Sequence, residues 1–394
     1  MAAVLGAGVG VFFGSGVAPL GEIGALLLGL IRVIAGPLLF FAVLDAFLRA
    51  EMSWSQVRRF GVFVLINACF AVAIGLALSN GLEPGRALSE AARGALGAAG
   101  ELEKLSTATL TFGGAIRGLL PKSLLHPFLE NSIPGIVMIA IALGVSFRKV
   151  KALGTFGENI VAVEKLSAVL LRAIEFLISG VVRIVPVAVF GVIAKIVGEQ
   201  GFSPFLGLPL YVGVVLSGLF LQVAVVYQLW LKVVARRGLR QFWRDASEPV
   251  IYALGASSSL VTLPVTLKTL DRMGVSRGSS RLVACVGTNL NNDGILLYEA
   301  LAVLVVAQAH GIHLSFSQQV WAAVICVLAS VGIGGIPDAG LISLSVVLTT
   351  VGMPIELLPL LLSVDWLLSR ARAATNVVCD LVGSCVLDSQ SRKK

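Results

Sequence analysis

Apolar runs of about 20 residues recur along the whole chain, and no other feature constrains its fold as strongly. A helix needs about 20 such residues to cross the hydrocarbon core of a bilayer. Of the 394 residues, 57% are hydrophobic and only 13% are charged, whereas soluble domains carry about 25% charged residues. The pattern therefore argues against a string of soluble domains. It predicts an all-α polytopic membrane protein.

The runs predict eight transmembrane helices and two further apolar stretches that are interrupted in the middle. The eight spans are approximately 1–15, 20–48, 57–80, 106–147, 160–198, 205–235, 282–309 and 355–387. The two interrupted stretches carry ASSSLVTLP at 256–264 and GIGGIPDAG at 332–340. Clustered Gly, Ser and Pro end a helix locally. Broken backbone at membrane depth is tolerated only where it is buried in protein or lines a cavity.

Basic residues are concentrated in short loops, and their distribution predicts the topology. The clusters include 58–59, 148–151, 232–244 and 272–281, and such clusters mark the cytoplasmic side. All of them share one side only if each interrupted stretch enters and leaves on the same face, as two opposed re-entrant helical hairpins. The alternative, two ordinary spans, would put 272–281 outside.

The net charge of +8 is thus interpreted as a topology signal, and no nucleic-acid partner is expected. We expect an integral, multi-pass protein of the bacterial inner membrane, surrounded by lipid, with a cytoplasmic C-terminus. Because the first span is short, the true start of the protein is expected to lie upstream. The five cysteines lie in apolar runs without metal-type spacing and are interpreted as small buried residues.

One segment near the C-terminus, DWLLSRARAATNVVCD at 365–380, is far more polar than its surroundings. On a helix of 3.6 residues per turn its polar side chains form a single stripe. Charges inside a membrane cost at least about 2.5–3.5 kcal/mol each and need partners or a solvated cavity. The stripe therefore indicates a site for an anionic solute beside a cation. Its members are Asp365, Ser369, Arg372, Asn376 and Asp380.

A second polar cluster opens the preceding span, GTNLNNDGILLYEALAVLVVAQ at 287–308. Asn289, Asn291 and Asp293 offer the hard oxygen atoms that Na⁺ prefers. Glu299, two turns further on, is an isolated carboxylate in apolar surroundings, which suits a proton carrier. A structural ion pair between Glu299 and Arg370 is the alternative, and both interpretations hold if that pair opens during turnover.

Four motifs, ASSSLVTLPVTL, NNDGILLYEA, GIPDAG and DWLLSRARAATNVVCD, follow one another in this chain. In this order they resemble the dicarboxylate/amino-acid:cation symporter family, which includes the glutamate transporter homologues. The resemblance is strongest over 246–387. It implies an elevator-type transporter, usually a homotrimer, in which a mobile domain carries the substrate between two hairpin tips. The implied domains are a scaffold at 1–50 and 105–200, a transport-domain helix with an outer loop at 51–104, and the transport domain proper at 201–394.

The resemblance also implies roles for single residues. Arg372 would grip a substrate carboxylate with its planar guanidinium, and Glu299 with Arg370 would couple protons. The coupling ions would be Na⁺ and possibly H⁺, without any other cofactor. The implied substrate-binding residues are Ser258, Ser259, Ile295, Gly335, Pro337, Gly340, Ser369, Arg372 and Asn376. The implied sodium ligands are Asp380 with Gly287, Asn291 and Asn376; Asp293 with Asn291, Asn289 and Asn67; and backbone near Ser330, Val331 and Ile333.

Several positions depart from the family pattern. Ser369 stands where the amino-acid carriers of the family have the aspartate that binds the substrate's ammonium group. At this position the chain resembles the dicarboxylate carriers instead. Ala373 and Ile295 replace threonines that contact the substrate. Asn292 stands where the motif has methionine, and Ala68 stands where a sodium-site hydroxyl is usual, so the number of coupled sodium ions is left open. We therefore predict cation-coupled import of a small C4-dicarboxylate such as succinate, fumarate or malate.

The alternative prediction is a carrier of aspartate or glutamate, which the pair Glu299 and Arg370 favours. Asp338 could then supply the missing counter-charge, or it could face solvent. A channel is disfavoured because there is one polar stripe and no repeated filter. An enzyme is not expected, because the serines at 257–259 have no GxSxG motif and none of the three histidines lies in a motif.

Overall fold

The computed structural model describes residues 2–49, 54–91, 123–129, 132–154, 156–287, 291–330, 339–355 and 357–391. Within these ranges all regular structure is helical. The α-helices are α1 (Ala2–Phe13), α2 (Ala18–Arg49), α3 (Trp54–Leu82), α4 (Pro84–Ala91), α7 (His126–Leu129), α8 (Ile133–Ala152), α9 (Gly157–Gln200), α10 (Leu208–Leu221), α11 (Leu239–Ala256), α12 (Ser259–Arg272), α13 (Arg277–Arg281), α14 (Asp293–Ala309), α15 (Phe316–Ser330), α16 (Ala339–Thr350), α17 (Leu358–Leu362) and α18 (Asp365–Ser391). Three π-helical segments continue them: η3 (Gln222–Tyr227), η4 (Trp230–Ala235) and η5 (Leu282–Val286).

Four helical segments among the described residues are long and apolar enough to cross a membrane: Val4–Gly24, Arg58–Leu82, Glu158–Glu199 and Leu208–Ala235. Large apolar side chains such as Phe176 and Phe220 are exposed on them, as expected for helices that face lipid rather than water. The prediction of an all-helical membrane protein is thereby confirmed. The count of eight spans stays a prediction, and the start of the predicted span 106–147 lies outside the described residues.

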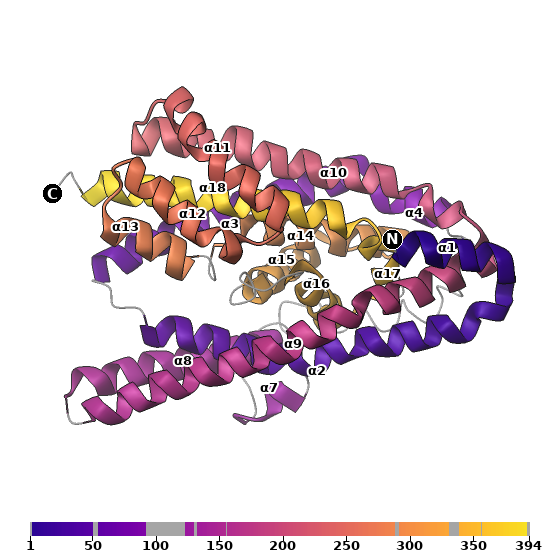
Figure 1. Cartoon of the computed structure of the whole chain (residues 1–394), viewed down its shortest axis with the longest axis horizontal. Helices are drawn as coiled ribbons and strands as arrows, with labels where there is room; N and C mark the ends of the chain where they lie inside the picture. Colours follow the sequence, from indigo (N-terminus) through magenta and orange to yellow (C-terminus); the bar gives the residue numbers. More distant parts are fainter. Residues whose placement is uncertain are drawn as a thin grey trace.

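The helices α1, α2, α8 and α9 pack against one another. Figure 1 shows α2, α8 and α9 running alongside each other on one side of the molecule, away from α10, α11 and α18. Glycines allow the close approach to α9, as is common between membrane helices. A Cβ atom on Gly24 would lie 2.5 Å from the carbonyl oxygen of Ala188. A Cβ atom on Gly198 would lie 2.2 Å from that of Gly14.

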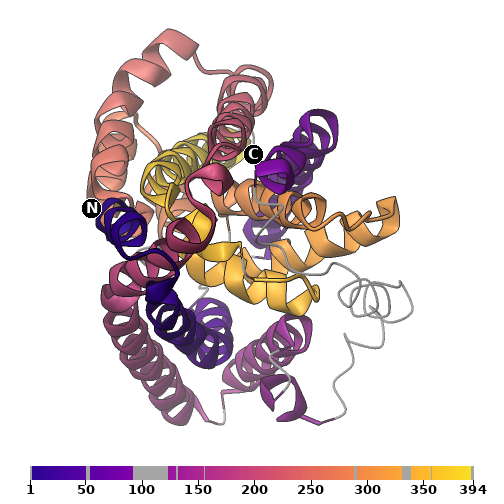
Figure 2. The same cartoon turned by 90° about the vertical axis from the view of Figure 1, so that its right-hand side faces the viewer.

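The other side of the molecule is built around α14 and α18. Nearly every residue of α14 is buried, because α3, α4, α10, α15, α16 and α18 all contact it. Figure 2 shows these helices gathered into a bundle when the molecule is seen end on. Since α14 and α18 carry the two polar clusters of the sequence, the fold places both clusters in its interior.

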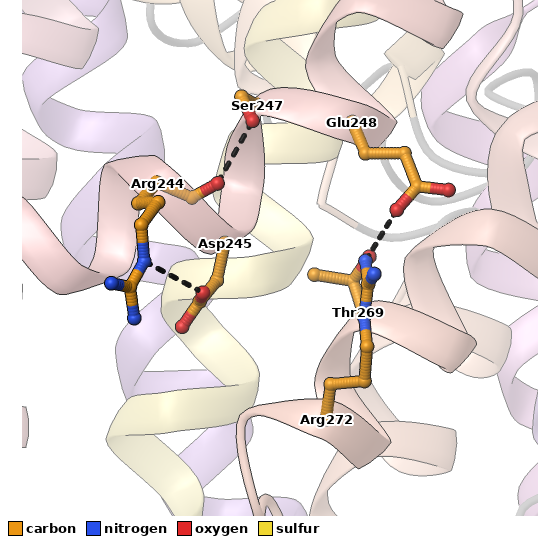
Figure 3. Close-up of polar contacts among 6 residues, drawn as sticks. All are labelled: Arg244, Asp245, Ser247, Glu248, Thr269 and Arg272. Atoms are coloured by element: carbon orange, nitrogen blue, oxygen red, sulfur yellow. Dashed lines mark hydrogen bonds and ion pairs between the residues drawn. The ribbon is translucent and has the colours of Figure 1, made fainter.

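Each interrupted stretch forms two helices that pack on each other, α11 with α12 and α15 with α16. The first pair turns at Ser257, whose φ of +53° is left-handed, and the side chain of Ser258 caps α12 by accepting from the backbone N–H of Val261 at 3.3 Å. Further along, Arg272 binds Glu248 and the hydroxyl of Thr269, which ties α12 to α11 (Figure 3). The turn of the second pair, 331–338, lies outside the described residues. Opposed entry into a membrane stays a prediction.

Candidate functional site

Arg372 and Asp365 form a bidentate ion pair inside the protein. Nη1 of Arg372 donates to Oδ1 of Asp365 at 2.6 Å, and Nη2 donates to Oδ2 at 3.0 Å. Arg372 is 3% exposed and Asp365 is 6% exposed. The guanidinium carbon also lies 4.1 Å from the centre of the Tyr298 ring, a cation–π contact that is stronger when water is excluded. The predicted substrate arginine thus already holds a carboxylate, one that belongs to its own helix.

The start of α14 is joined to α18 and to the end of α15 by amide groups. Oδ1 of Asn376 accepts from the backbone N–H of Gly294 at 2.8 Å. Nδ2 of Asn376 faces Oδ1 of Asn292 at 3.4 Å, and Nδ2 of Asn292 donates to the carbonyl oxygen of Ser330 at 3.1 Å. Residues separated by more than 80 positions therefore meet within one hydrogen-bond network. Asn376 and Ser330, both predicted site residues, belong to it.

The two helix pairs reach the same region as Arg372. A Cβ atom on Gly340, at the start of α16, would lie 2.5 Å from Nη2 of Arg372. From the other pair, Ser257 accepts a hydrogen bond from Nη1 of Arg370 at 2.9 Å. Ser258 and Ser259, which follow in the turn, are buried. The second helix pair thus lies against Arg372 of the polar stripe, and the first is bonded to Arg370 of the same helix.

Ser369 is buried, and its hydroxyl points back to the carbonyl oxygen of Trp366 at 3.4 Å. The side chain therefore adds no charge to the stripe. Ile295, predicted to contact substrate, is buried one residue after Gly294. These two positions supply one short hydroxyl and one apolar surface.

A third cluster surrounds Asp293. Its Oδ2 atom accepts from Tyr227 at 3.0 Å, from the thiol of Cys379 at 3.1 Å and from Gln222 at 3.3 Å. Asn67 and Asn291, the other predicted ligands of this sodium site that the structure describes, point their Nδ2 atoms at the same sulfur. The predicted ligands are brought together, with a thiol among them.

Asp380 and Gly287 are two further predicted sodium ligands. Asp380 is buried at the centre of α18. The carbonyl oxygen of Gly287 accepts from the backbone N–H of Asn291 at 2.7 Å. Six residues of interest lie outside the described residues: Asn289, Val331, Ile333, Gly335, Pro337 and Asp338.

Glu299 is fully buried in α14, and neither of its carboxylate oxygens has a hydrogen bond of ordinary geometry to any described residue. Ser343 and Arg372 are close enough to influence the carboxylate. Arg370 is turned to Ser257 and to the carbonyl oxygen of Trp366. Among the described residues, Glu299 and Arg370 therefore form no ion pair with each other, as the structural alternative would require.

Sequence reasoning missed several residues of these clusters. Asp365 was placed on the polar stripe but not beside Arg372, although two helical turns separate them and bring them to one face. Tyr298, Gln222, Tyr227, Trp230 and Cys379 had no assigned role. Buried tyrosine and tryptophan need a polar partner, and this was the available signal.

The apolar helices thus enclose a buried arginine, several amides and the four buried carboxylates of Asp293, Glu299, Asp365 and Asp380. These features define the class of membrane proteins with an internal polar binding site. Secondary transporters are built in this way. The sequence profile of the sodium:dicarboxylate symporter family matches residues 1–390. The chain belongs to this family.

Named relatives agree with that assignment. Over 269 residues the chain is 34% identical to excitatory amino acid transporter 1 of Homo sapiens, covering 68% of this chain and 49% of that protein. It is 33% identical over 264 residues to an excitatory amino acid transporter of Caenorhabditis elegans, covering 66% and 51%, and 34% identical over 263 residues to excitatory amino acid transporter 4 of Mus musculus, covering 66% and 46%. The chain spans about half the length of these relatives. Family and relatives are transporters by name, not enzymes.

Proposed function

We propose that this protein is a cation-coupled symporter that carries a small solute with two carboxylate groups. The bidentate pair of Arg372 and Asp365 supports the proposal most directly. A buried guanidinium that accommodates one carboxylate in this planar geometry can accommodate another of the same shape. The family's description, a symporter of sodium and dicarboxylates, names a substrate of this chemistry.

Substrate binding is an exchange of carboxylates at Arg372. In the structure Asp365 accepts one hydrogen bond from each Nη atom, and an incoming carboxylate of the same planar geometry takes its place. The exchange keeps one negative charge beside the buried cation throughout, which avoids leaving it uncompensated in a medium of low dielectric constant. Gly340 lies against the guanidinium, so α16 must move slightly to admit the solute. This couples binding to the second helix pair.

The relatives favour an acidic amino acid, the alternative of the sequence analysis, over the C4-dicarboxylate that the residues suggested first. All three relatives are called excitatory amino acid transporters. An amino acid brings an ammonium group that Ser369 cannot neutralise. Once displaced from Arg372, Asp365 is available for this role, because it lies one turn before Ser369 on the same face of α18. We assign aspartate or glutamate as the leading substrate.

The second candidate is a C4-dicarboxylate such as succinate. It is favoured by the neutral, buried hydroxyl of Ser369, which donates to the carbonyl oxygen of Trp366 in its own helix. A dianion without an ammonium group needs no further carboxylate there. Asp365 would then remain a counter-charge for Arg372 alone.

The remaining parts of the proposal concern coupling and assembly. Sodium is the proposed coupling ion, and Glu299 is the proposed proton carrier. We propose that α1, α2, α8 and α9, which pack on one another, form the scaffold of an elevator mechanism together with α7, that the other helices move, and that three copies assemble.

Uptake into proteoliposomes tests the proposal. Labelled aspartate and labelled succinate are compared, each with and without an inward sodium gradient, in the wild type and in Ser369→Asp. Aspartate uptake by the wild type, strengthened in Ser369→Asp, supports the amino-acid assignment. Succinate uptake alone, lost in Ser369→Asp through repulsion of like charges, supports the second candidate. Absence of sodium-driven uptake of both would refute sodium symport.

A further inference from the structure

The sulfur atom of Cys379 lies at the centre of the side chains predicted to hold one sodium ion. It is 2.9 Å from Nδ2 of Asn291, 3.6 Å from Nδ2 of Asn67 and 3.1 Å from Oδ2 of Asp293. All four residues are buried. Two amides donate to the sulfur, and the thiol donates to the carboxylate. The thiol therefore takes the central position that a shared cation would need.

Asn67 is held in an orientation that suits the sulfur and not a cation. Trp230 donates a hydrogen bond from Nε1 to Oδ1 of Asn67 at 2.9 Å. Because an indole nitrogen can only donate, the atom of Asn67 that faces it must be the carbonyl oxygen. The NH₂ group then faces the centre of the cluster, and an NH₂ group cannot bind Na⁺.

Asp293 is likewise satisfied without a cation. A buried carboxylate must be compensated by charge or by hydrogen bonds, and three donors converge on its Oδ2 atom. Tyr227 and Gln222 come from η3, and Trp230 begins η4. Single π-helical turns inside helices often mark functional positions, and these two lie against the predicted cation site.

Oxygen atoms that could serve a cation nevertheless remain beside the cluster. Oδ1 of Asn291 and Oε1 of Gln222 are buried and have no hydrogen-bond partner among the described residues. If the sulfur were removed, the amide of Asn291 would lose its acceptor and could turn its oxygen toward the vacated space. Hard oxygens suit alkali cations, whereas a neutral thiol is a soft ligand.

We propose that Cys379 is a specificity-determining residue that closes the sodium site of Asn67, Asn291 and Asp293, so that this protein transports without a sodium ion there. The inference rests on the proposed function, cation-coupled symport, and specifies which of its cation sites is used. The sites at Asp380 and near Ser330 would carry the remaining coupling.

The experiment measures sodium binding to purified protein in the absence of substrate, followed by tryptophan fluorescence. Trp230 reports on the site because it bonds to Asn67. Cys379→Ala removes the sulfur, and Cys379→Ser replaces it with a hydroxyl oxygen, which is a hard ligand. Choline replaces sodium at equal ionic strength as the control. Each variant is accepted only if it elutes from gel filtration like the wild type.

Cys379→Ala and Cys379→Ser are both expected to lower the sodium concentration for half-maximal response, by about tenfold for Cys379→Ala, and to raise the Hill coefficient of sodium-driven uptake, because alanine vacates the position and serine places a hard oxygen there. Adding Asp293→Asn to Cys379→Ala is expected to remove the gain. A wild-type response that Asp293→Asn abolishes, or identical responses of wild type and Cys379→Ala, would overturn the inference. Failure of the proposed function would appear separately, as wild-type proteoliposomes that take up neither aspartate nor succinate.

Discussion

Arg372 binds both carboxylate oxygens of Asp365, which lies two turns earlier in the same helix. The pair makes the buried site neutral while no solute is bound. Removing one partner of such a pair costs about 3–5 kcal/mol, because the other charge is left uncompensated. The pair therefore holds Arg372 in place for a solute and, at the same time, competes with that solute for its guanidinium.

Asp365→Asn separates these two roles. Without a solute, the variant contains an unpaired buried guanidinium and is expected to lose thermal stability in detergent. Succinate no longer competes with a carboxylate, so its Kd is expected to fall by about tenfold for every 1.4 kcal/mol of competition removed. Aspartate is expected to bind more weakly, since its ammonium group loses a counter-charge. Calorimetric titration of both solutes checks this, and parallel changes in the two affinities would contradict the role of Asp365.

Arg372→Lys tests the need for a planar fork. A lysine keeps the positive charge but cannot donate two parallel hydrogen bonds, so the uptake rate at low substrate is expected to fall by more than about tenfold, as a loss of 1.4 kcal/mol would produce. Arg370→Lys is the matched control from the same helix. Arg370 is exposed and binds Ser257 through a single Nη atom, which an ammonium can imitate. Equal losses of uptake in both variants would argue against bidentate recognition.

The sequence predicted the polar stripe well, because its residues lie on one regular helix. Asp365, Ser369, Arg372 and Asn376 are spaced by about one turn each, so periodicity alone brings them to one side. The start of α14 was also found, because hard oxygen side chains are rare inside apolar segments. What spacing cannot give is which of these groups pair with each other, and so the contact between Arg372 and Asp365 was not foreseen.

The cluster around Asp293 could not be predicted from helical periodicity. Gln222 and Tyr227 are five residues apart and would point well away from each other on an α-helix. They meet at the same carboxylate oxygen because η3 is a π-helical segment with i→i+5 bonding. No residue pattern in this stretch signals that change of register. The interpretation of the cysteines as small buried residues is wrong for Cys69 and Cys285, which are exposed. For Cys379 it is correct for the burial and incomplete for the contacts.

Gly294→Ala tests how tightly α14 and α18 are packed. A Cβ atom at this position would lie 2.7 Å from the backbone oxygen of Arg372 and 2.9 Å from Oδ1 of Asn376. Because the backbone of α18 cannot rotate away, the variant is expected to lose about 1–3 kcal/mol of stability together with substrate binding. Gly213→Ala in α10 is the control, since nothing lies within 4 Å of its Cβ position. Thermal unfolding in detergent measures both, and a loss confined to Gly213→Ala would contradict the packing.

Glu299→Gln tests proton coupling. The carboxyl group is fully buried and has no ordinary hydrogen bond to a described residue, so a charged form is expensive there. A glutamine of the same shape cannot take up or release a proton. The variant is expected to retain substrate exchange across the membrane, which needs no net proton movement. It is expected to lose the stimulation of uptake by an inward proton gradient at constant sodium. The structural alternative, in which Glu299 only supports folding, predicts equal loss of exchange and of gradient-driven uptake. The two assays, run on one preparation of proteoliposomes, distinguish a proton carrier from a structural carboxylate.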